Sequence, residues 1–319
     1  MIASKSDCSA ERRQKKMTYP NSFASASAAD ALAFLKSPTL LARRFEQIIA
    51  DRGGFIAHRV LKGRWKMEGG ALVYTPDEAI STDDAAEKIK PGGEYPMIEL
   101  SADATLVIEA LKEGFGTPIT DEKVGRERMD AVERAIARLV NRLVTDFDET
   151  AMAAVASAVT QSITGTAWTS NPKSIVKQVQ LAKAKITGLR LGFRADAIVL
   201  TDEQWAGVVS ELLDMLPREQ RNGVESGQFI NALGLDWLHS PDLPSGWVPT
   251  VMDTDNLGGI GHEDIPSPEY RPVSLGQDQV AEVARFREKN DSTTVQVRKT
   301  DVPVVRNPKA ACEITSTGL

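Results

Sequence analysis

The stretch from residue 121 to residue 159 constrains the fold of this 319-residue chain more than any other part. It contains no proline and a single glycine, Gly125, and apolar residues recur along it every three or four positions. This spacing predicts an amphipathic helix, with Thr120 or Asp121 as its N-cap. The helix would be about 55–60 Å long, whereas a compact chain of this length would be only ~50 Å across. We therefore expect a spine helix that crosses an elongated molecule.

One face of this helix carries the residues expected to form the core. They step by three or four positions and form a single apolar stripe, as helical geometry requires. The predicted spine-helix core consists of Val132, Ile136, Leu139, Leu143 and Phe147. We expect this stripe to pack under a β-sheet.

Composition excludes several classes of protein. The chain is 42% hydrophobic and 26% charged, which is typical of a folded protein, and its net charge of −6 argues against a basic nucleic-acid-binding face. Cys8 and Cys312 are too few for a disulfide framework or a zinc site. No apolar run approaches the ~20 residues of a membrane span, and the N-terminus does not resemble a secretory signal. We expect a protein that works or is assembled in a cytoplasm.

The N-terminal third predicts two projecting parts. Residues 1–27 are polar and read as an arm, and a helix is expected over 29–50, broken near Pro38. Between residues 53 and 102, strands are expected at 55–60, 71–74 and 95–100, separated by glycine- and proline-containing turns. This segment has too little apolar mass for a core of its own. We therefore predict a long β-hairpin that lies on another surface.

The rest of the chain predicts a second lobe and a return to strands. A helix over 172–188, a strand at 197–200, a helix over 203–216 and short strands between 230 and 260 form an α/β pattern. Further strands are expected at 283–286, 293–297, 302–305 and 312–315, with turns at Asn290-Asp291 and Asn307-Pro308. These last strands should pair beside the spine helix.

Catalytic signatures are absent from the sequence. It contains no phosphate-binding loop of the GxxxxGK[ST] type, no GxGxxG, no GxSxG and no CxxC. A triad using His239 or His262 with Asp253 or Asp255 is an enzyme hypothesis, but loop histidines more commonly have no catalytic role. The acidic residues near 253–264 depart from the calcium-loop pattern and are more typical of turns. We predict no catalytic, cofactor-binding or metal-binding residues.

The order of these parts resembles the major capsid proteins of tailed bacteriophages, which share the shell fold of the Hong Kong lambdoid phage. Residues 195–205 (ADAIVLTDEQW) are similar to the strand and helix that open the axial domain of that family. Residues 233–258 resemble its passage of strand, turn and second strand, and residues 302–315 are similar to its usual last strand. The resemblance covers nearly the whole chain.

This resemblance implies an α+β fold with four parts. They are an N-terminal arm and helix (1–52), an extended β-hairpin loop (53–102), a peripheral domain with the spine helix (103–170 and 272–319) and an axial domain (171–271). The implied function is structural: a major capsid protein that self-assembles as pentamers and hexamers into an icosahedral virus head. The head encloses double-stranded DNA without sequence-specific binding, and the protein resides in the virion after assembly in the host cytoplasm, with no membrane partner.

The same resemblance suggests further partners and contacts. Scaffold, decoration and portal proteins are the other partners, and a separate scaffold protein, or none, is expected because only about 50 residues precede the β-hairpin. The residues expected to contact neighbouring subunits are the hairpin tip at Gly69 and Gly70, the acidic pair Asp83 and Asp84, and the arm residues Arg12 and Arg13. Some relatives crosslink their subunits through Lys–Asn isopeptide bonds, for which Lys62, Lys66 and Asn307 are candidates, although lysines in an exposed arm usually serve solubility.

Two alternatives remain at this point. An encapsulin-like nanocompartment shell protein would share the fold but enclose a cargo enzyme, and a cargo-binding groove on its inner face would favour it. An α/β enzyme using the histidines named above would instead be a compact monomer or dimer with a deep pocket. The extended hairpin and the long polar N-terminal arm favour the phage capsid over the compartment, and the spine helix and the absence of catalytic motifs count against the enzyme.

Overall fold

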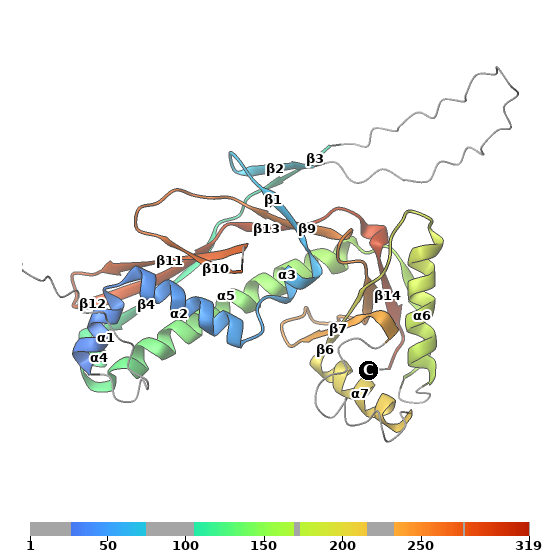
Figure 1. Cartoon of the computed structure of the whole chain (residues 1–319), viewed down its shortest axis with the longest axis horizontal. Coiled ribbons are helices and arrows are strands. Elements are labelled where there is room, and N and C mark those ends of the chain that lie inside the picture. Colours follow the sequence, from blue (N-terminus) through green and yellow to red (C-terminus); the bar gives the residue numbers. More distant parts are fainter. Residues whose placement is uncertain (1–26, 75–104, 169–172, 216–232, 277, 319) are drawn as a thin grey trace, which may run out of the picture.

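The long helix α5 (Met129–Ala158) runs through the body of the molecule and organises its packing (Figure 1). The computed structural model describes residues 27–74, 105–168, 173–215, 233–276 and 278–318. The other helices are α1 (Ala28–Leu35), α2 (Pro38–Asp51), α3 (Ile56–Val60), α4 (Asp121–Glu127), α6 (Lys173–Gly188), α7 (Asp202–Met215) and the 3₁₀ helix η3 (Pro308–Ala310). In the described residues the strands fall into four sheets, and α5 packs against β4, β12 and β13.

The predicted helix over 121–159 is broken near its start, which corrects the expectation of one uninterrupted spine. Thr120 caps α4 by accepting the backbone N–H of Lys123. Arg128 then takes φ +53° and ψ −130°, and α5 begins at the next residue. Val124 of α4 and Met129 of α5 both lie in the main core on either side of this break. The break leaves a 30-residue helix of about 45 Å.

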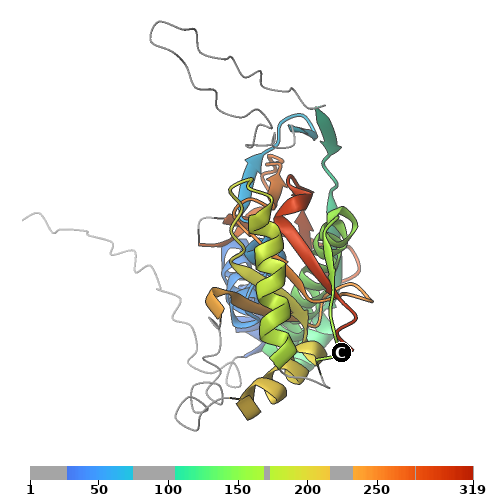
Figure 2. The same cartoon turned by 90° about the vertical axis from the view of Figure 1, so that its right-hand side faces the viewer.

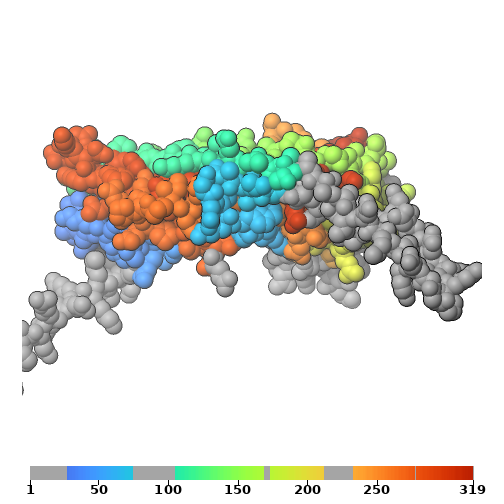
Figure 3. Space-filling model, turned by 90° about the horizontal axis from the view of Figure 1, so that it is seen from above, coloured from blue at the N-terminus to red at the C-terminus, as the bar shows by residue number. Residues whose placement is uncertain are grey.

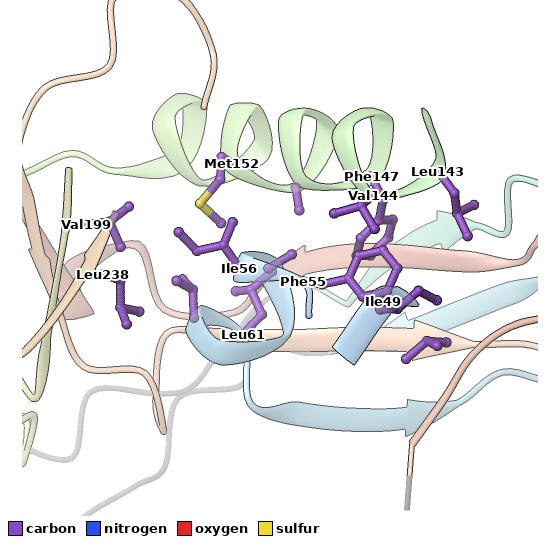
Figure 4. Close-up of a cluster of buried hydrophobic side chains, with 14 of the residues drawn as sticks. Ile49, Phe55, Ile56, Leu61, Leu143, Val144, Phe147, Met152, Val199 and Leu238 are labelled. Atoms are coloured by element: carbon purple, nitrogen blue, oxygen red, sulfur yellow. The ribbon is translucent and has the colours of Figure 1, made fainter. Parts of the chain in front are cut away.

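The predicted apolar stripe of α5 lies in the main core. All five of its residues are at most 3% exposed, and α5 packs against β4, β12 and β13 as well as α2 and α3. Figure 4 shows Leu143, Val144 and Phe147 of α5 facing Ile49 and Phe55. Further along the helix, Met152 lies near Ile56, and Val199 and Leu238 of the second lobe close the cluster. The spine helix therefore joins the two ends of one continuous core.

A four-stranded antiparallel sheet covers one half of α5. Its order is β10 (Arg271–Leu275), β11 (Asp278–Arg287), β12 (Ser292–Lys299) and β4 (Glu113–Thr120). β11 and β12 form the predicted hairpin at Asn290-Asp291, where Asp291 adopts a positive φ of 51°. The helix predicted over 29–50 is present as α1 and α2, which meet at Pro38, and α2 packs against β10, β11 and α5.

A five-stranded sheet forms the second lobe. Its order is β5 (Ser162–Thr164), β14 (Ala311–Thr315), β8 (Thr250–Met252), β6 (Ala197–Thr201) and β7 (Asp236–Ser240). Helix α6 packs against β14, β5 and β8, and α7 packs against β6 and β7. The last strand of the chain therefore belongs to this sheet and not to the one beside the spine helix. The segment 272–319 is divided between the lobes.

Two small sheets connect the lobes to the projecting part. β9 (Gly258–His262) lies between β1 (Gly63–Lys66), which is parallel to it, and β13 (Asp301–Val305), which is antiparallel. Gly63 and Gly259 are register partners, and a Cβ on Gly259 would collide with the backbone of Gly63. β2 (Ala71–Tyr74) pairs with β3 (Leu106–Glu109) as a two-stranded ribbon. Seen from above, the cyan surface of β1 and β2 lies at the middle of the elongated body (Figure 3).

The strand expected at 55–60 is wrong, because these residues form helix α3. Asp148 of α5 accepts the backbone N–H groups of Ile56 and Ala57 at 3.1 and 3.0 Å. A carboxylate in this position satisfies donors that a helix leaves unpaired at its N-terminus. The projecting ribbon consequently starts at β2, and the strand expected at 95–100 lies outside the described residues.

Candidate functional site

The β2–β3 ribbon has one packed face and one open face. On the packed side, Leu72, Tyr74 and Ile108 cover a small cluster of Met67, Val302 and Val304. On the open side, Val73 and Val107 are direct cross-strand partners and are 62% and 63% exposed. Leu111, just beyond β3, is 61% exposed. Since an isolated two-stranded hairpin is marginally stable in water, this open face is a candidate contact surface.

A buried lysine lies where the ribbon joins the body. The Lys299 side chain at the end of β12 is 2% exposed. Its Nζ lies 3.0 Å from Asp301 Oδ2 and 3.2 Å from His58 Nε2. The same ammonium lies 3.5 Å from the ring centre of Phe147 and 4.1 Å from that of Phe55. Carboxylate, imidazole and two aromatic faces together replace the water that this cation loses on burial.

Burial shifts the proton affinities of the groups around Lys299. It lowers the pKa of Lys299 itself against the opposing effect of Asp301. Burial and then Lys299 lower the pKa of His58 to about 2, so this imidazole is neutral and can accept from the ammonium. Burial also raises the pKa of Asp148 to about 6, although the two backbone donors of α3 oppose the shift.

His262 extends the network towards the surface. Its Nδ1 donates to Asp301, and its Nε2 lies 3.0 Å from Asp264 Oδ1. The hydrogen bond to Asp301 outweighs burial and raises the pKa of His262, so the imidazolium form is favoured between the two carboxylates. An open hollow of about 410 Å³ lies over this network, with Trp65 and Gln279 also in its wall. The network joins α3, β9, β12 and β13, and Lys299 brings it against Phe147 of the spine helix.

The structure places the predicted tip residues elsewhere. Gly69 and Gly70 have positive φ values of 74° and 79° and form the turn that enters β2, so they are not the tip of the hairpin. The N–H of Gly70 donates to Glu263 Oε1 at 3.0 Å. The prediction of a hairpin tip at these glycines is wrong. β2 pairs with β3 and not with β1, so residues 75–104, and not Gly69 and Gly70, connect the two strands of the ribbon.

The candidate crosslinking residues are engaged within their own chain. Lys62 Nζ lies 3.1 Å from Asp196 and 3.0 Å from Asp255. Lys66 Nζ lies 3.6 Å from Asp264. Asn307 is buried, and its side-chain amide donates to the carbonyl of Asn256 at 2.8 Å. Asp83, Asp84, Arg12 and Arg13 lie outside the described residues, and their contacts stay predictions.

The histidine–aspartate pairs that the enzyme hypothesis requires are not formed among the described residues. His239 Nδ1 contacts Asp202 at 2.7 Å, and its ring stacks on Trp205. Asp253 closes a turn by accepting the backbone N–H groups of Asp255 and Asn256, so it is not a partner of either histidine. Within the described ranges, no group of three or more histidine, cysteine or acidic side chains could hold a metal ion. Nor is any helix in those ranges long and apolar enough to cross a membrane.

Sequence reasoning did not identify the open ribbon face or the buried lysine network. The alternation of Leu72, Val73 and Tyr74 signals a strand but not which face is covered, because two of the three covering residues lie more than two hundred positions away in β13. Lys299 follows a strand and reads as a charged strand end. Its burial depends on Phe55 and Phe147, which tertiary packing brings together.

Comparison with known proteins identifies a family. A family model described as phage capsid protein matches residues 103–314, about two thirds of the chain. The match includes α5, the four-stranded sheet and nearly all of the five-stranded sheet. No curated protein sequence matches the chain.

Solved structures share the fold at low sequence identity. A protein of Microbacterium phage Oxtober96 superposes with a TM-score of 0.57 and 12% identity, covering 82% of this chain and 91% of its own. A virus-like particle from Pyrococcus furiosus gives 0.56 and 9%, covering 86% and 97%. The capsid structure of cyanophage P-SCSP1u gives 0.55 and 13%, covering 79% and 85%. These similarities extend across both lobes.

Proposed function

We propose that this chain, which belongs to the phage capsid protein family, is the major capsid protein of a tailed bacteriophage, with copies that form pentamers and hexamers of an icosahedral head around double-stranded DNA. Membership of the family makes it a structural protein of the virus head and not an enzyme. The observation that carries the proposal is the family match across both lobes. The particular assembly contacts are argued from the surfaces described above.

The open ribbon face is the first proposed contact with a neighbouring copy. Val73, Val107 and Leu111 present apolar surface away from their own chain. Residues 75–104, between β2 and β3, carry eight acidic and two basic side chains in the sequence. An apolar strip followed by a charged segment matches the anatomy of protein interfaces, which have an apolar centre and a polar rim. We assign Asp83 and Asp84 to that rim.

We assign the two lobes to the two domains of a capsid subunit. Residues 103–170 and 272–299 would form the peripheral domain with the spine helix, and the five-stranded sheet would form the axial domain. Rings of axial domains close by rotation, since heterologous contacts between identical subunits can close into cyclic oligomers. Arg12 and Arg13 of the N-terminal arm would contact an adjacent copy.

The negative net charge of the subunit is compatible with a capsid that encloses nucleic acid. A subunit with net charge −6 is repelled on average by phosphates, so packaged DNA would be enclosed without tight binding. The network of Lys299, Asp301 and His262 is buried or half-buried, and we assign it to holding β13, on which the ribbon packs, against the spine helix.

Electron microscopy of the expressed protein, alone and with the neighbouring phage genes, tests this function. Uniform shells that protect double-stranded DNA from nuclease in the co-expressed sample support it. Shells that enclose a protein cargo and no DNA would instead identify an encapsulin-like nanocompartment, the alternative that has the same fold as a phage capsid protein. Only soluble monomers or dimers in every condition would overturn the proposal.

A further inference from the structure

The axial lobe carries opposite charges on two successive segments. Residues 173–194 contain six basic and no acidic side chains, namely Lys173, Lys177, Lys183, Lys185, Arg190 and Arg194. Residues 195–215 contain five acidic and no basic side chains, namely Asp196, Asp202, Glu203, Glu211 and Asp214. The first segment is mainly α6 and the second mainly α7. The two charge signs are therefore completely separated between adjacent segments of one lobe.

The two helices lie at opposite ends of the five-stranded sheet. α6 packs against the β5 and β14 end, and α7 packs against the β6 and β7 end. In Figure 2, α6 runs along the end of the molecule that faces the viewer, and α7 lies below it. One lobe therefore presents a basic side and an acidic side in different directions.

Some of the basic side chains of α6 form hydrogen bonds within the chain, and others are exposed and available for a contact with another copy. On α6, Lys183 and Lys185 donate to the carbonyls of Leu233 and Ser162. Lys173 and Lys177 are exposed one turn apart, and neither contacts an acidic group among the described residues. Like charges at this spacing repel each other in a helix. Leu181, one turn further along the same row, is 49% exposed.

The acidic side has a matching row. Glu203 and Glu211 lie two turns apart on α7, with Gly207 between them in the row. Neither forms an ion pair among the described residues, whereas Asp196 is held by Lys62 and Asp202 by His239. The half-exposed stack of Trp205 on His239 lies beside this row and offers an apolar surface.

We propose that the row of Lys173, Lys177 and Leu181 in one copy docks on the row of Glu203 and Glu211 in the next copy, so that axial lobes join head to tail. This inference rests on the proposed capsid function and names the contact that closes its rings. Opposite charges on different sides of one lobe attract between copies and set the direction of the ring. Exposed ion pairs are individually weak and screened by salt, so repetition around the ring supplies the strength.

Charge reversal in full-length chains tests the contact. One variant carries Lys173→Glu and Lys177→Glu, and a second carries Glu203→Lys and Glu211→Lys. Each alone presents like charges at the contact, and we expect at least a tenfold loss of shells in electron micrographs and sedimentation. The chain with all four substitutions should regain shells. Lys173→Arg with Lys177→Arg keeps the charge and is the matched control, which should assemble like the wild type.

Co-expression of the two reversed variants gives a sharper outcome. One variant has two acidic sides and the other two basic sides, so copies can join only in alternation. A six-membered ring closes under that rule and a five-membered ring cannot, so tubes or flat sheets should replace closed shells. Circular dichroism of the unassembled variants checks that each is folded.

Several results would overturn the inference while leaving the capsid function intact. The inference would be wrong if the wild type and both reversed variants all formed normal shells. Failure of the fourfold variant, with each variant folded, would also contradict it. Normal shells from the Lys→Glu variant that have lost their DNA would assign α6 to nucleic acid instead. Absence of shells from the wild type and the arginine control would count against the proposed function itself.

Discussion

The spine helix and the β2–β3 ribbon both carry apolar residues at regular spacing, but their environments are opposite. The stripe of α5 is buried beneath β4, β12 and β13. The ribbon covers its own chain with one face and leaves Val73 and Val107 in solvent. The comparison separates two uses of apolar surface. One stabilises the subunit, and the other remains available for contacts between subunits.

The largest effect on folding is expected in the spine helix. Leu139→Ala removes a side chain that is 3% exposed and should lower the free energy of unfolding by roughly 2–5 kcal/mol. Chemical denaturation of the unassembled subunit measures this. The neighbouring Arg138→Ala is the matched control, since Arg138 is exposed and its loss should change stability by less than about 0.5 kcal/mol. Equal effects from the two variants would contradict the placement of the stripe.

A second effect should depend on pH through Asp148. Its pKa of about 6 in the folded chain exceeds the value of ~3.9 in unfolded chains. The folded state therefore binds more protons, and wild-type stability falls as pH rises from about 4 to 6. The difference in unfolding free energy between Asp148→Asn and the wild type should shift by roughly 3 kcal/mol in favour of the variant over that range. A difference independent of pH would contradict the buried carboxylate.

His262 should act at higher pH and with a smaller magnitude. Because its pKa is raised in the folded chain, its stabilisation is complete below about 6.5 and is lost as pH rises through the folded value. His262→Gln should therefore cost about 1–3 kcal/mol at pH 6 and less at pH 9, as measured by thermal and urea unfolding. His239→Gln, at a half-exposed pair, is the control and should cost under about 1 kcal/mol.

Lys62 should contribute little to folding. Its ion pairs with Asp196 and Asp255 are partly exposed, so Lys62→Ala should cost about 0–1 kcal/mol. The same variant tests crosslinking, because an isopeptide bond through Lys62 would give a ladder of covalent oligomers on a denaturing gel. We expect a single band from wild-type shells, since both Lys62 and Asn307 are engaged within the chain. A ladder that Lys62→Ala removes would contradict this.

The smallest effect on folding is expected in the ribbon. Val73→Ser with Val107→Ser changes two exposed side chains, and the free energy of unfolding of the subunit should move by less than about 0.5 kcal/mol. The fraction of protein in shells should nevertheless fall, as measured by sedimentation. Lys112→Ser, an exposed polar position beside the ribbon, should leave both quantities unchanged. A loss of subunit stability without a loss of shells would contradict the claim that the open ribbon face serves contacts between subunits and not folding.

Sequence periodicity predicts the parts of the fold that depend on local spacing. The stripe from Val132 to Phe147, the interruption at Pro38 and the turn at Asn290-Asp291 each have a local physical cause and are present. Residues 55–60 are apolar enough to read as a strand. They form α3 because Asp148, about ninety residues away, accepts its first N–H groups.

The candidate contact surfaces were harder to predict for the same reason. Charge segregation between 173–194 and 195–215 is visible in the sequence, but its meaning depends on which ends of the sheet α6 and α7 cover. Likewise, the sequence cannot distinguish Leu72 from Val73, because packing on Met67 and β13 determines which of them is covered. Exposure is a property of tertiary structure, and contacts between copies depend on it.

The most direct test of the account is sedimentation velocity on the wild-type chain and on a chain in which a short Gly-Ser link replaces residues 75–104. Both keep β2, β3 and the complete core, and co-expressed phage proteins supply any scaffold. We predict shells from the wild type and folded, unassembled subunits from the shortened chain. Normal shells from the shortened chain would contradict the claim that residues 75–104 join the subunits.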